Sequence, residues 1–253
     1  MHREDARAVA AVGRALPRIA RAADLIARRL RDGGRLWFIG AGTSGRLGVL
    51  EAAECPPTFH TDPSLVQAII AGGSRAVFRS QEGAEDDRAR ARLAVERRVR
   101  PADVVVGITA SGVTPFVEEA LRRARRCGAR TVLVTSHPRS PIPSHVRISL
   151  PVGPELLSGS TRLKAGTATK LALNMLTLGA MVRLGKTHGN LMVDVRPTSR
   201  KLRARAVRII QSLAGCSASE AASSLRAARG RVRVALQRAV SSKSKKAGLR
   251  VSK

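Results

Sequence analysis

The sequence has few of the residues on which several classes of protein depend. Its 253 residues include one Trp, four Phe and no Tyr, so aromatic residues make up only 2% of the chain. Side chains that stack on nucleic-acid bases are therefore scarce, and the core must be built from Leu, Val, Ile and Ala. The three cysteines, Cys55, Cys127 and Cys216, form no C-x-x-C pair. That spacing argues against a disulfide framework and against a structural zinc site.

Export signals and membrane spans are also missing. Glu4 and Asp5 stand where a signal peptide would carry its basic segment, and no apolar segment follows them. No run approaches the roughly 18 apolar residues that a membrane span needs. The five histidines lack the clustered spacing of metal ligands, so we expect no metal site. We therefore predict a cytoplasmic protein that does not associate with membranes.

Acidic residues are scarce relative to basic ones. The chain has 46 Lys and Arg against 18 Asp and Glu, which gives a net charge of +28. An excess of this size is typical of proteins that bind polyanions. The arginines, however, are spread over predicted helix surfaces, and residues 241–246 resemble a frayed basic end. We expect a general affinity for polyanions at low salt, but no specific nucleic-acid binding.

Hydrophobic periodicity predicts an alternation of strands and helices. Short apolar runs predict buried strands over residues 36–39, 66–70, 103–108, 131–135 and 146–150. Three- and four-residue spacing predicts helices over residues 5–31, 84–99 and 115–127, and Pro17 must kink the first or start a second one. This order indicates parallel β-α-β units and an α/β fold. From about residue 160 the pattern is helical, and we predict a main domain over 1–197 and a C-terminal helical region over 198–253.

A glycine-rich turn follows the first predicted strand. Between Gly40 and Gly45 it offers free backbone amides, the hydroxyls of Thr43 and Ser44, and the N-terminus of the next helix. Those groups together favour an anion. The turn lacks the Gly-Lys-Ser/Thr of a P-loop and a suitably spaced acid for a ribose. We therefore predict a site for a small phosphomonoester; the alternative is an ordinary strand-to-helix turn.

A second polar turn follows the strand over residues 103–108. It contains Ser111, Gly112 and Thr114. In α/β sheets ligands gather outside the carboxyl ends of the strands, and both turns are predicted there. We therefore expect the two turns to share one phosphate. The candidate phosphate-binding residues are Gly42, Thr43, Ser44, Ser111, Gly112 and Thr114.

Two carboxylates are candidates for acid–base chemistry. Glu54 lies near the end of the helix after the first turn, and Glu85 lies in an acidic segment before the next helix. The alternative for both residues is a structural role, which for Glu85 is at a helix N-terminus. Ser160 and Lys164 belong to a donor-rich segment, and we predict that they contact substrate; for Lys164 the alternative is plain surface charge.

Five segments together resemble N-acetylmuramic acid 6-phosphate etherases. They are residues 39–48, 53–58, 82–87, 158–167 and 189–195, and they occur in the order of that family. The resemblance implies a sugar isomerase (SIS) fold, which is a flavodoxin-like αβα sandwich, and a homodimer. It implies a lyase of cell-wall sugar recycling that needs no metal or organic cofactor.

The reaction that the resemblance implies cleaves the D-lactyl ether of N-acetylmuramic acid 6-phosphate. The products are N-acetylglucosamine 6-phosphate and D-lactate. In the family's scheme the sugar opens to its aldehyde, a base removes the C2 proton, an acid assists the departure of lactate from C3, and water adds. The family's base falls on Glu85 and its acid on Glu54.

Two departures from the family pattern bear on activity. The chain starts later than the family usually does, and Val113 stands where the family usually has Arg. We expect the shorter start and the lost donor to weaken substrate contacts. They keep open an alternative, a sugar-phosphate sensor without catalysis, like the related glucokinase regulatory protein.

Overall fold

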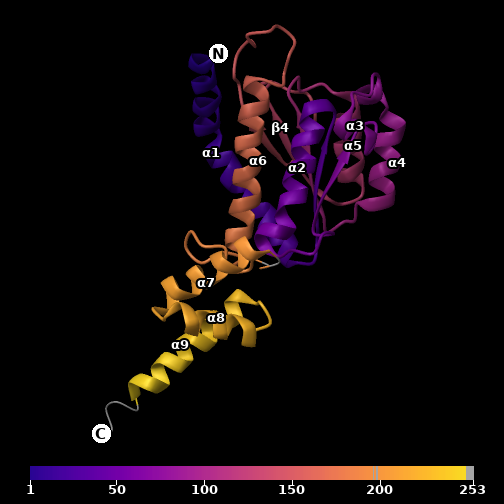
Figure 1. Cartoon of the computed structure of the whole chain (residues 1–253). Helices are drawn as coiled ribbons and strands as arrows, with labels where there is room; N and C mark the ends of the chain where they lie inside the picture. The colour runs from indigo at the N-terminus through magenta and orange to yellow at the C-terminus, as the bar shows by residue number, and fades with distance from the viewer. Residues whose placement is uncertain (196, 198, 249–253) are drawn as a thin grey trace. The chain divides into compact units, whose positions relative to one another are not determined.

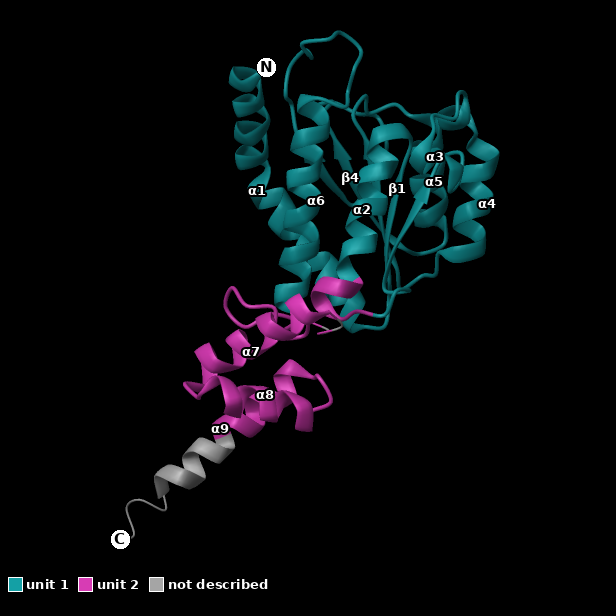
Figure 2. Ribbon diagram, viewed as in Figure 1, with its two compact units in different colours: residues 1–55, 62–184 teal, residues 56–61, 185–253 magenta. Residues whose placement is uncertain are grey.

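The computed structural model describes residues 1–195, 197 and 199–248, and the chain forms two compact units. Unit 1 comprises residues 1–55 and 62–184, and unit 2 comprises residues 56–61 and 185–253; Figure 2 draws them in teal and magenta. Each unit has its own core. The predicted division between residues 197 and 198, as a boundary between independently folding domains, stays a prediction.

Unit 1 is built on a parallel sheet of five strands. In space the order is β2-β1-β3-β4-β5. The strands are β1 (Leu36–Gly40), β2 (Val66–Ile70), β3 (Val104–Thr109), β4 (Arg130–Thr135) and β5 (Val146–Ser149). Gly40 pairs with both Ile70 and Ile108, so the carboxyl ends of the central strands lie at one edge. The predicted α/β fold with a flavodoxin-like parallel sheet is confirmed.

Helices cover both faces of this sheet (Figure 1). On one face α4 (Arg88–Arg98) and α5 (Pro115–Arg126) pack against Trp37 and its neighbours. On the other face lie α2 (Gly42–Phe59) and α6 (Lys164–Arg183). A Cβ added at Gly48 of α2 would come within 2.8 Å of the Cβ of Phe38, a side chain that points away from Trp37. The result is the predicted three-layer sandwich, with short helices α3 (Arg75–Phe78) and η1 (Ala84–Asp86) between β2 and α4.

The first helix, α1 (His2–Arg31), is continuous and packs along α6 (Figure 1). Pro17 therefore does not start a second helix. Its ring is on the exposed side, where water can bond the Gly13 carbonyl that Pro17 leaves without a donor. Six of the ten buried residues of α1 are alanines, and a Cβ added at Gly179 of α6 would come within 3.1 Å of Ala23. This close packing stabilises the helix on both sides of the proline.

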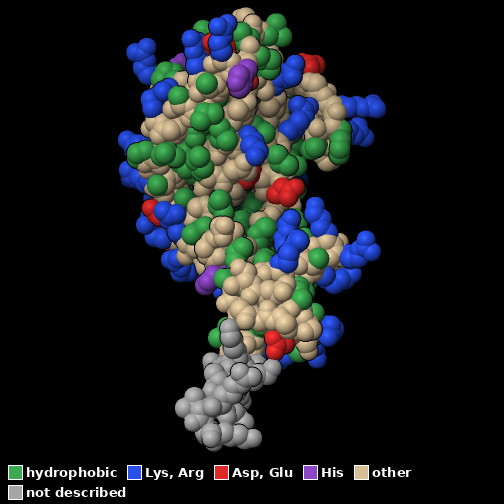
Figure 3. Space-filling model, turned by 60° about the vertical axis from the view of Figure 1, so that its left-hand side comes forward, with side chains coloured by type: hydrophobic (Ala, Val, Ile, Leu, Met, Phe, Trp, Pro, Cys, Tyr) green, Lys and Arg blue, Asp and Glu red, His purple; other side chains and the backbone are tan. Residues whose placement is uncertain are grey.

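Apolar side chains also remain exposed on unit 1. Met175, Leu178 and Val182 of α6 and Leu50 of α2 are all exposed, Leu178 by 51%. Figure 3 shows hydrophobic side chains gathered among Lys and Arg on the side that carries α1 and α6. Such a patch on a folded chain is typical of a contact surface.

Unit 2 is a small helical unit with its own core. Its helices are α7 (Arg200–Ala214), α8 (Ala218–Ala227) and α9 (Val232–Gly248). Ser199 caps α7 by accepting from the Leu202 N–H, and Ser217 forms a capping box with Glu220 at α8. The core includes Ile210, Leu225 and the preceding Val193. None of the helices within the described part of the chain is long and apolar enough to cross a membrane.

Candidate phosphate and acid–base site

The strand order places the expected ligand crevice between β1 and β3. The chain moves outward from β1 to β2 and then returns to the other side of β1 at β3. In flavodoxin-like sheets the carboxyl edge at such a reversal is where ligands bind. Both sequence-predicted turns, residues 40–45 and 111–114, follow these two neighbouring strands. The expected convergence of the two turns therefore has a topological basis.

The first turn leads directly from β1 into α2. Gly45 has to be glycine because an added Cβ would lie 2.5 Å from Ile70 and 2.7 Å from the Gly40 carbonyl oxygen. Its N–H bonds the Ala41 carbonyl at 3.1 Å. The N–H groups that precede it in the first turn have no partner within the helix, and that turn contains no acidic residue. The N-terminus of α2 is therefore available to an anion.

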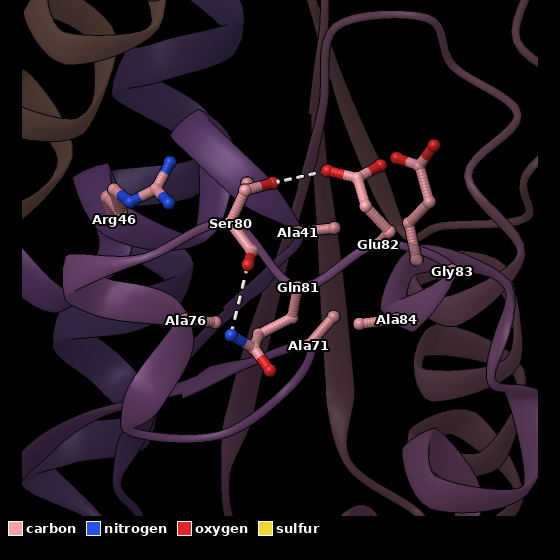
Figure 4. Close-up of a pocket in the computed structure, with 11 residues that line it drawn as sticks. Ala41, Arg46, Ala71, Ala76, Ser80, Gln81, Glu82, Gly83 and Ala84 are labelled. Carbon is pink, nitrogen blue, oxygen red and sulfur yellow. Dashed lines mark hydrogen bonds between the residues drawn. The ribbon is translucent and has the colours of Figure 1, made fainter.

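A cavity of about 150 Å³ opens beside this turn. Gly42 and Arg46 of α2 line one side, and the segment that ends at Glu85 lines the other. Figure 4 shows Arg46 across the cavity from Glu82, with Ser80 lying between them. Ser80 donates a hydrogen bond to Glu82 at 2.8 Å, while the Arg46 Nε donates to the Val77 carbonyl at 2.9 Å. The cavity thus joins a helix N-terminus, a guanidinium and a carboxylate.

The second turn is organised by its hydroxyl groups. The Thr109 Oγ1 lies 2.7 Å from the Thr114 Oγ1 and 3.3 Å from the Ser111 Oγ. Gly112 has a φ of +75°, and a Cβ there would come within 2.7 Å of His137. Its N–H donates to the Thr109 Oγ1 at 3.1 Å. Thr114 and Ser111 thus present a fixed cluster of hydroxyls at the end of β3, and Val113 between them is exposed.

Lys164 is the first residue of α6, and Ser160 lies four residues before it. The start of this helix is beside the first turn, because a Cβ at Gly166 would be 3.7 Å from the Thr43 methyl group. Ser160 is half-buried. Lys164 is buried, and its ammonium donates to the Glu4 carboxylate of α1. This hydrogen bond lowers the pKa of Glu4.

An internal carboxylate already occupies the N-terminus of α6. Glu155 accepts from the N–H groups of Lys164 and Ala165, each at 3.0 Å. The two helix N-termini near the β1/β3 edge therefore differ. That of α2 has no acid in its first turn, whereas that of α6 is capped by Glu155.

Glu54 lies away from the other candidates within one chain. It is exposed on α2, twelve residues after Gly42, which corresponds to about 18 Å along the helix axis. It does not line the cavity that contains Glu85. The neighbouring Glu51 is buried and accepts from the Asn174 amide and, at 2.7 Å, from the Thr177 hydroxyl. Burial raises the pKa of Glu51.

The structure therefore brings some of the predicted site residues together and leaves others apart. Gly42 and Glu85 line one cavity, and the hydroxyl turn belongs to the adjacent strand end. Glu54 belongs elsewhere on the surface of the same chain. Arg46 was not among the predicted site residues. Its position directly after the glycine-rich turn, one helical turn from Gly42, is the signal that could have identified it.

Comparisons with known proteins agree on the type of fold. Residues 18–125 match the glucokinase regulatory protein N-terminal SIS domain, and residues 84–179 match the SIS domain. Among solved structures, phosphoheptose isomerases from Neisseria gonorrhoeae and Francisella tularensis both superpose with a TM-score of 0.52, at 17% and 16% identity. These superpositions cover 71% and 73% of this chain, and 94% and 95% of those chains. At such identities the likeness shows the fold alone.

Closer relatives match most of the chain. A protein of Gloeobacter violaceus named N-acetylmuramic acid 6-phosphate etherase is 59% identical over 237 residues, which is 92% of this chain and 78% of that protein. A protein of the same name from Symbiobacterium thermophilum is 53% identical over 238 residues, 93% of this chain and 79% of that protein.

Proposed function

The chain belongs to the N-acetylmuramic acid 6-phosphate etherase family, and we propose that it cleaves the D-lactyl ether of that sugar phosphate. The products are N-acetylglucosamine 6-phosphate and D-lactate. The observation that carries this function is the 59% identity to a protein of that name over 92% of the chain. A regulatory-protein domain matches only residues 18–125, so the enzyme is favoured over a sugar-phosphate sensor without catalysis.

We assign the 6-phosphate to the β1/β3 edge of the sheet. Support comes from the first turn of α2, where Gly42, Thr43 and Ser44 precede the first intrahelical hydrogen bond and no acid competes for their amides. The hydroxyls of Ser111 and Thr114 and the Gly112 turn complete the cradle from β3. Arg46 adds a cation on the cavity side. A dianionic phosphate group takes such mixed amide, hydroxyl and guanidinium donors well.

We assign the general base to Glu85. Its carboxylate lines the same cavity as the phosphate turn. In the open-chain sugar the C2 proton is adjacent to the aldehyde, and its removal forms the enolate. The C3–O bond then breaks, lactate leaves with a proton from the general acid, and water adds to C3 while C2 regains a proton. Atoms and charges balance without an oxidant or a reductant.

Replacing Glu85 tests this role directly. With N-acetylglucosamine 6-phosphate in deuterated water, we expect the wild type to exchange the C2 proton. Glu85→Gln should slow this exchange by about 10²- to 10⁴-fold, the usual contribution of a general base. Glu82→Gln, which changes a second carboxylate of the same cavity, serves as the matched control and should retain exchange. Full exchange by Glu85→Gln would remove Glu85 from this role.

We assign the general acid to Glu54, delivered by a second copy of the chain in a homodimer. Support comes from two features. Glu54 and Glu85 are too far apart along one chain to act on adjacent carbons, and Glu54 is exposed one turn after the exposed Leu50. Leu178 and its neighbours on α6 extend this apolar surface. They lie beside α2, because Glu51 of α2 accepts a hydrogen bond from α6. A two-fold dimer through this surface would bring Glu54 of one copy towards the cavity of the other.

Ser160 and Lys164 complete the proposed set on the sugar side. Lys164 begins α6, Ser160 lies four residues before it, and the first turn of α6 lies beside Thr43, which suits a contact with the sugar or its lactyl carboxylate. The Lys164 ammonium is buried and bonded to Glu4, so it contacts the substrate only when its hydrogen bond to Glu4 breaks.

We also assign the protein to the cytoplasm, the compartment that its three free cysteines suit. Cell fractionation tests that assignment.

A further inference from the structure

Unit 2 contains a cavity that the proposed reaction does not use. It has a volume of about 440 Å³ and is lined by residues 190–192 and by one side of α7. The volume is in the range of small-molecule pockets, about 300–1,000 Å³. Asn190, Leu191 and Met192 belong to the segment 189–195, which carried part of the family resemblance and has no place in the proposed chemistry.

Two arginines of α7 line this cavity from the same helix face. Arg205 and Arg208 are three residues apart, a spacing that brings side chains together on a helix. Ser212 follows one turn later, and the buried Ile209 lies between them. Within residues 1–195, 197 and 199–248, neither guanidinium makes a hydrogen bond or an ion pair.

No nearby acid is free to neutralise this pair. Residues 185–253 contain seventeen Lys and Arg but only two acids, Asp194 and Glu220. Asp194 accepts from the Arg233 Nε at 2.8 Å and lies 3.7 Å from the Lys186 Nζ. Glu220 closes the capping box of α8. Within the described residues, neither acid is paired with Arg205 or Arg208.

We propose that this cavity is a second anion site, which binds a small phosphomonoester. The phosphate lies between Arg205 and Arg208, and the carbon skeleton of the ligand lies against Leu191 and Met192. A single guanidinium fork satisfies a carboxylate, whereas a dianionic phosphate can accept from two forks at once. The Ser212 hydroxyl and the Asn190 amide supply further hydrogen bonds. This site is additional to the proposed reaction site of unit 1.

Calorimetric titration of the full chain with N-acetylglucosamine 6-phosphate tests the proposal. We expect two sites per chain in the wild type. Arg205→Gln/Arg208→Gln should keep the reaction-site binding and weaken the second site by at least about tenfold. Arg200→Gln/Arg203→Gln is the matched control, because it removes the same charge from the same helix at residues that do not line the cavity. It should retain both sites.

Two further titrations separate the sites and the ligand chemistry. Ser111→Ala/Thr114→Val should weaken only the reaction site, and unphosphorylated N-acetylglucosamine should leave the unit 2 cavity empty. If the Gln pair does not fold, as judged by circular dichroism, Arg205→Lys/Arg208→Lys replaces it. The lysine pair keeps the positive charge but loses both bidentate guanidinium groups, so phosphate binding should still weaken.

One site per chain in the wild type would overturn the proposal. So would equal weakening by the cavity pair and the control pair, since that result reports net charge alone. Failure of the reaction itself is distinguishable, because lactate release is measured separately and does not depend on the number of sites.

Discussion

At the opposite edge of the sheet from the site, one buried carboxylate joins the start of β1 to the turn before β3. Asp103 accepts hydrogen bonds from the Arg35 side chain, from the Trp37 Nε1 at 3.0 Å and from the Arg100 N–H at 2.9 Å. The Arg35 guanidinium also lies 5.2 Å from the centre of the Trp37 ring. Burial would raise the pKa of Asp103, but these hydrogen bonds together outweigh it and lower the pKa. The carboxylate is therefore stabilised in its charged form.

Asp103→Ala should destabilise unit 1 by about 3–5 kcal/mol, because it leaves the Arg35 charge and the Trp37 N–H without their partner. Because the folded pKa is lowered, the wild-type stabilisation is complete above the unfolded pKa of about 3.9 and is lost as pH falls through the folded value. Urea unfolding, followed by Trp37 fluorescence, measures the loss of stability in the variant and the pH dependence of stability in the wild type. Glu118→Gln, at a surface pair with Arg88 and Arg122, should cost no more than about 1 kcal/mol. Equal effects of the two substitutions would contradict this account of Asp103.

Single residues also mark the limit of prediction from sequence. The glycine and hydroxyl pattern of residues 40–45 predicted the position of the first turn, because any side chain at Gly45 would clash with neighbouring atoms. The partner of Lys164 could not be predicted, since Glu4 is 160 residues away in sequence and meets it only when α1 packs on α6. The role of Arg46 was missed because its cavity needs the segment 80–85 as a second wall.

Among the elements, α2 connects the site to the rest of unit 1. Its N-terminus forms the turn proposed to bind phosphate, and its middle is fixed to α6 by Glu51, which bonds Asn174 and Thr177. Burial raises the pKa of Glu51, and the hydrogen bond from Thr177 opposes that shift without cancelling it. The charged form of Glu51 is therefore less stable in the folded chain than in the unfolded chain.

The contribution of Glu51 to the stability of the wild type should consequently fall as pH rises from about 4.3, the ordinary glutamate pKa, through the raised folded value. Over that window the folded chain binds the proton more tightly than the unfolded chain does. Glu51→Gln retains an amide oxygen for the Thr177 hydroxyl and removes the titration, so its stability should change less with pH. Denaturant titrations at several pH values between 4 and 8 measure the difference. Parallel pH profiles for the two proteins would refute a raised pKa at Glu51.

The elements themselves were largely predictable from their periodicity. The five strands begin and end within a residue or so of the predicted ranges, because fully buried parallel strands leave unbroken apolar runs such as residues 103–108. The helix after the first turn is longer than expected and includes Pro56 and Pro57. Proline rules predicted too early an end there and left a kink or a second helix open at Pro17, because local propensity does not include the packing that holds a helix through a proline.

For the whole molecule, the sequence predicted the fold and the reaction, but not the separation of the two glutamates. Glu54 and Glu85 are the proposed acid and base, and within one chain about 18 Å of α2 separates Glu54 from the proposed phosphate turn. The proposed homodimer with shared sites accounts for this separation. The family resemblance implied a homodimer, but the sharing of one site between two copies could not be predicted from the residues of one chain.

Mixing two inactive variants tests the shared site. Glu54→Gln and Glu85→Gln should each be inactive alone. If subunits exchange at random, half of the dimers contain one of each, and each such dimer has one intact site, so activity should recover to about a quarter of the wild type. Light scattering establishes the dimer first. No recovery after proven subunit exchange would mean that both glutamates act from the same chain.

The release of D-lactate shows most directly whether this chain is an etherase. It is measured by incubating the purified full chain with N-acetylmuramic acid 6-phosphate in deuterated water. We expect D-lactate and an equal amount of N-acetylglucosamine 6-phosphate that carries deuterium at C2. Intact binding of the sugar phosphate without any release of lactate would contradict it.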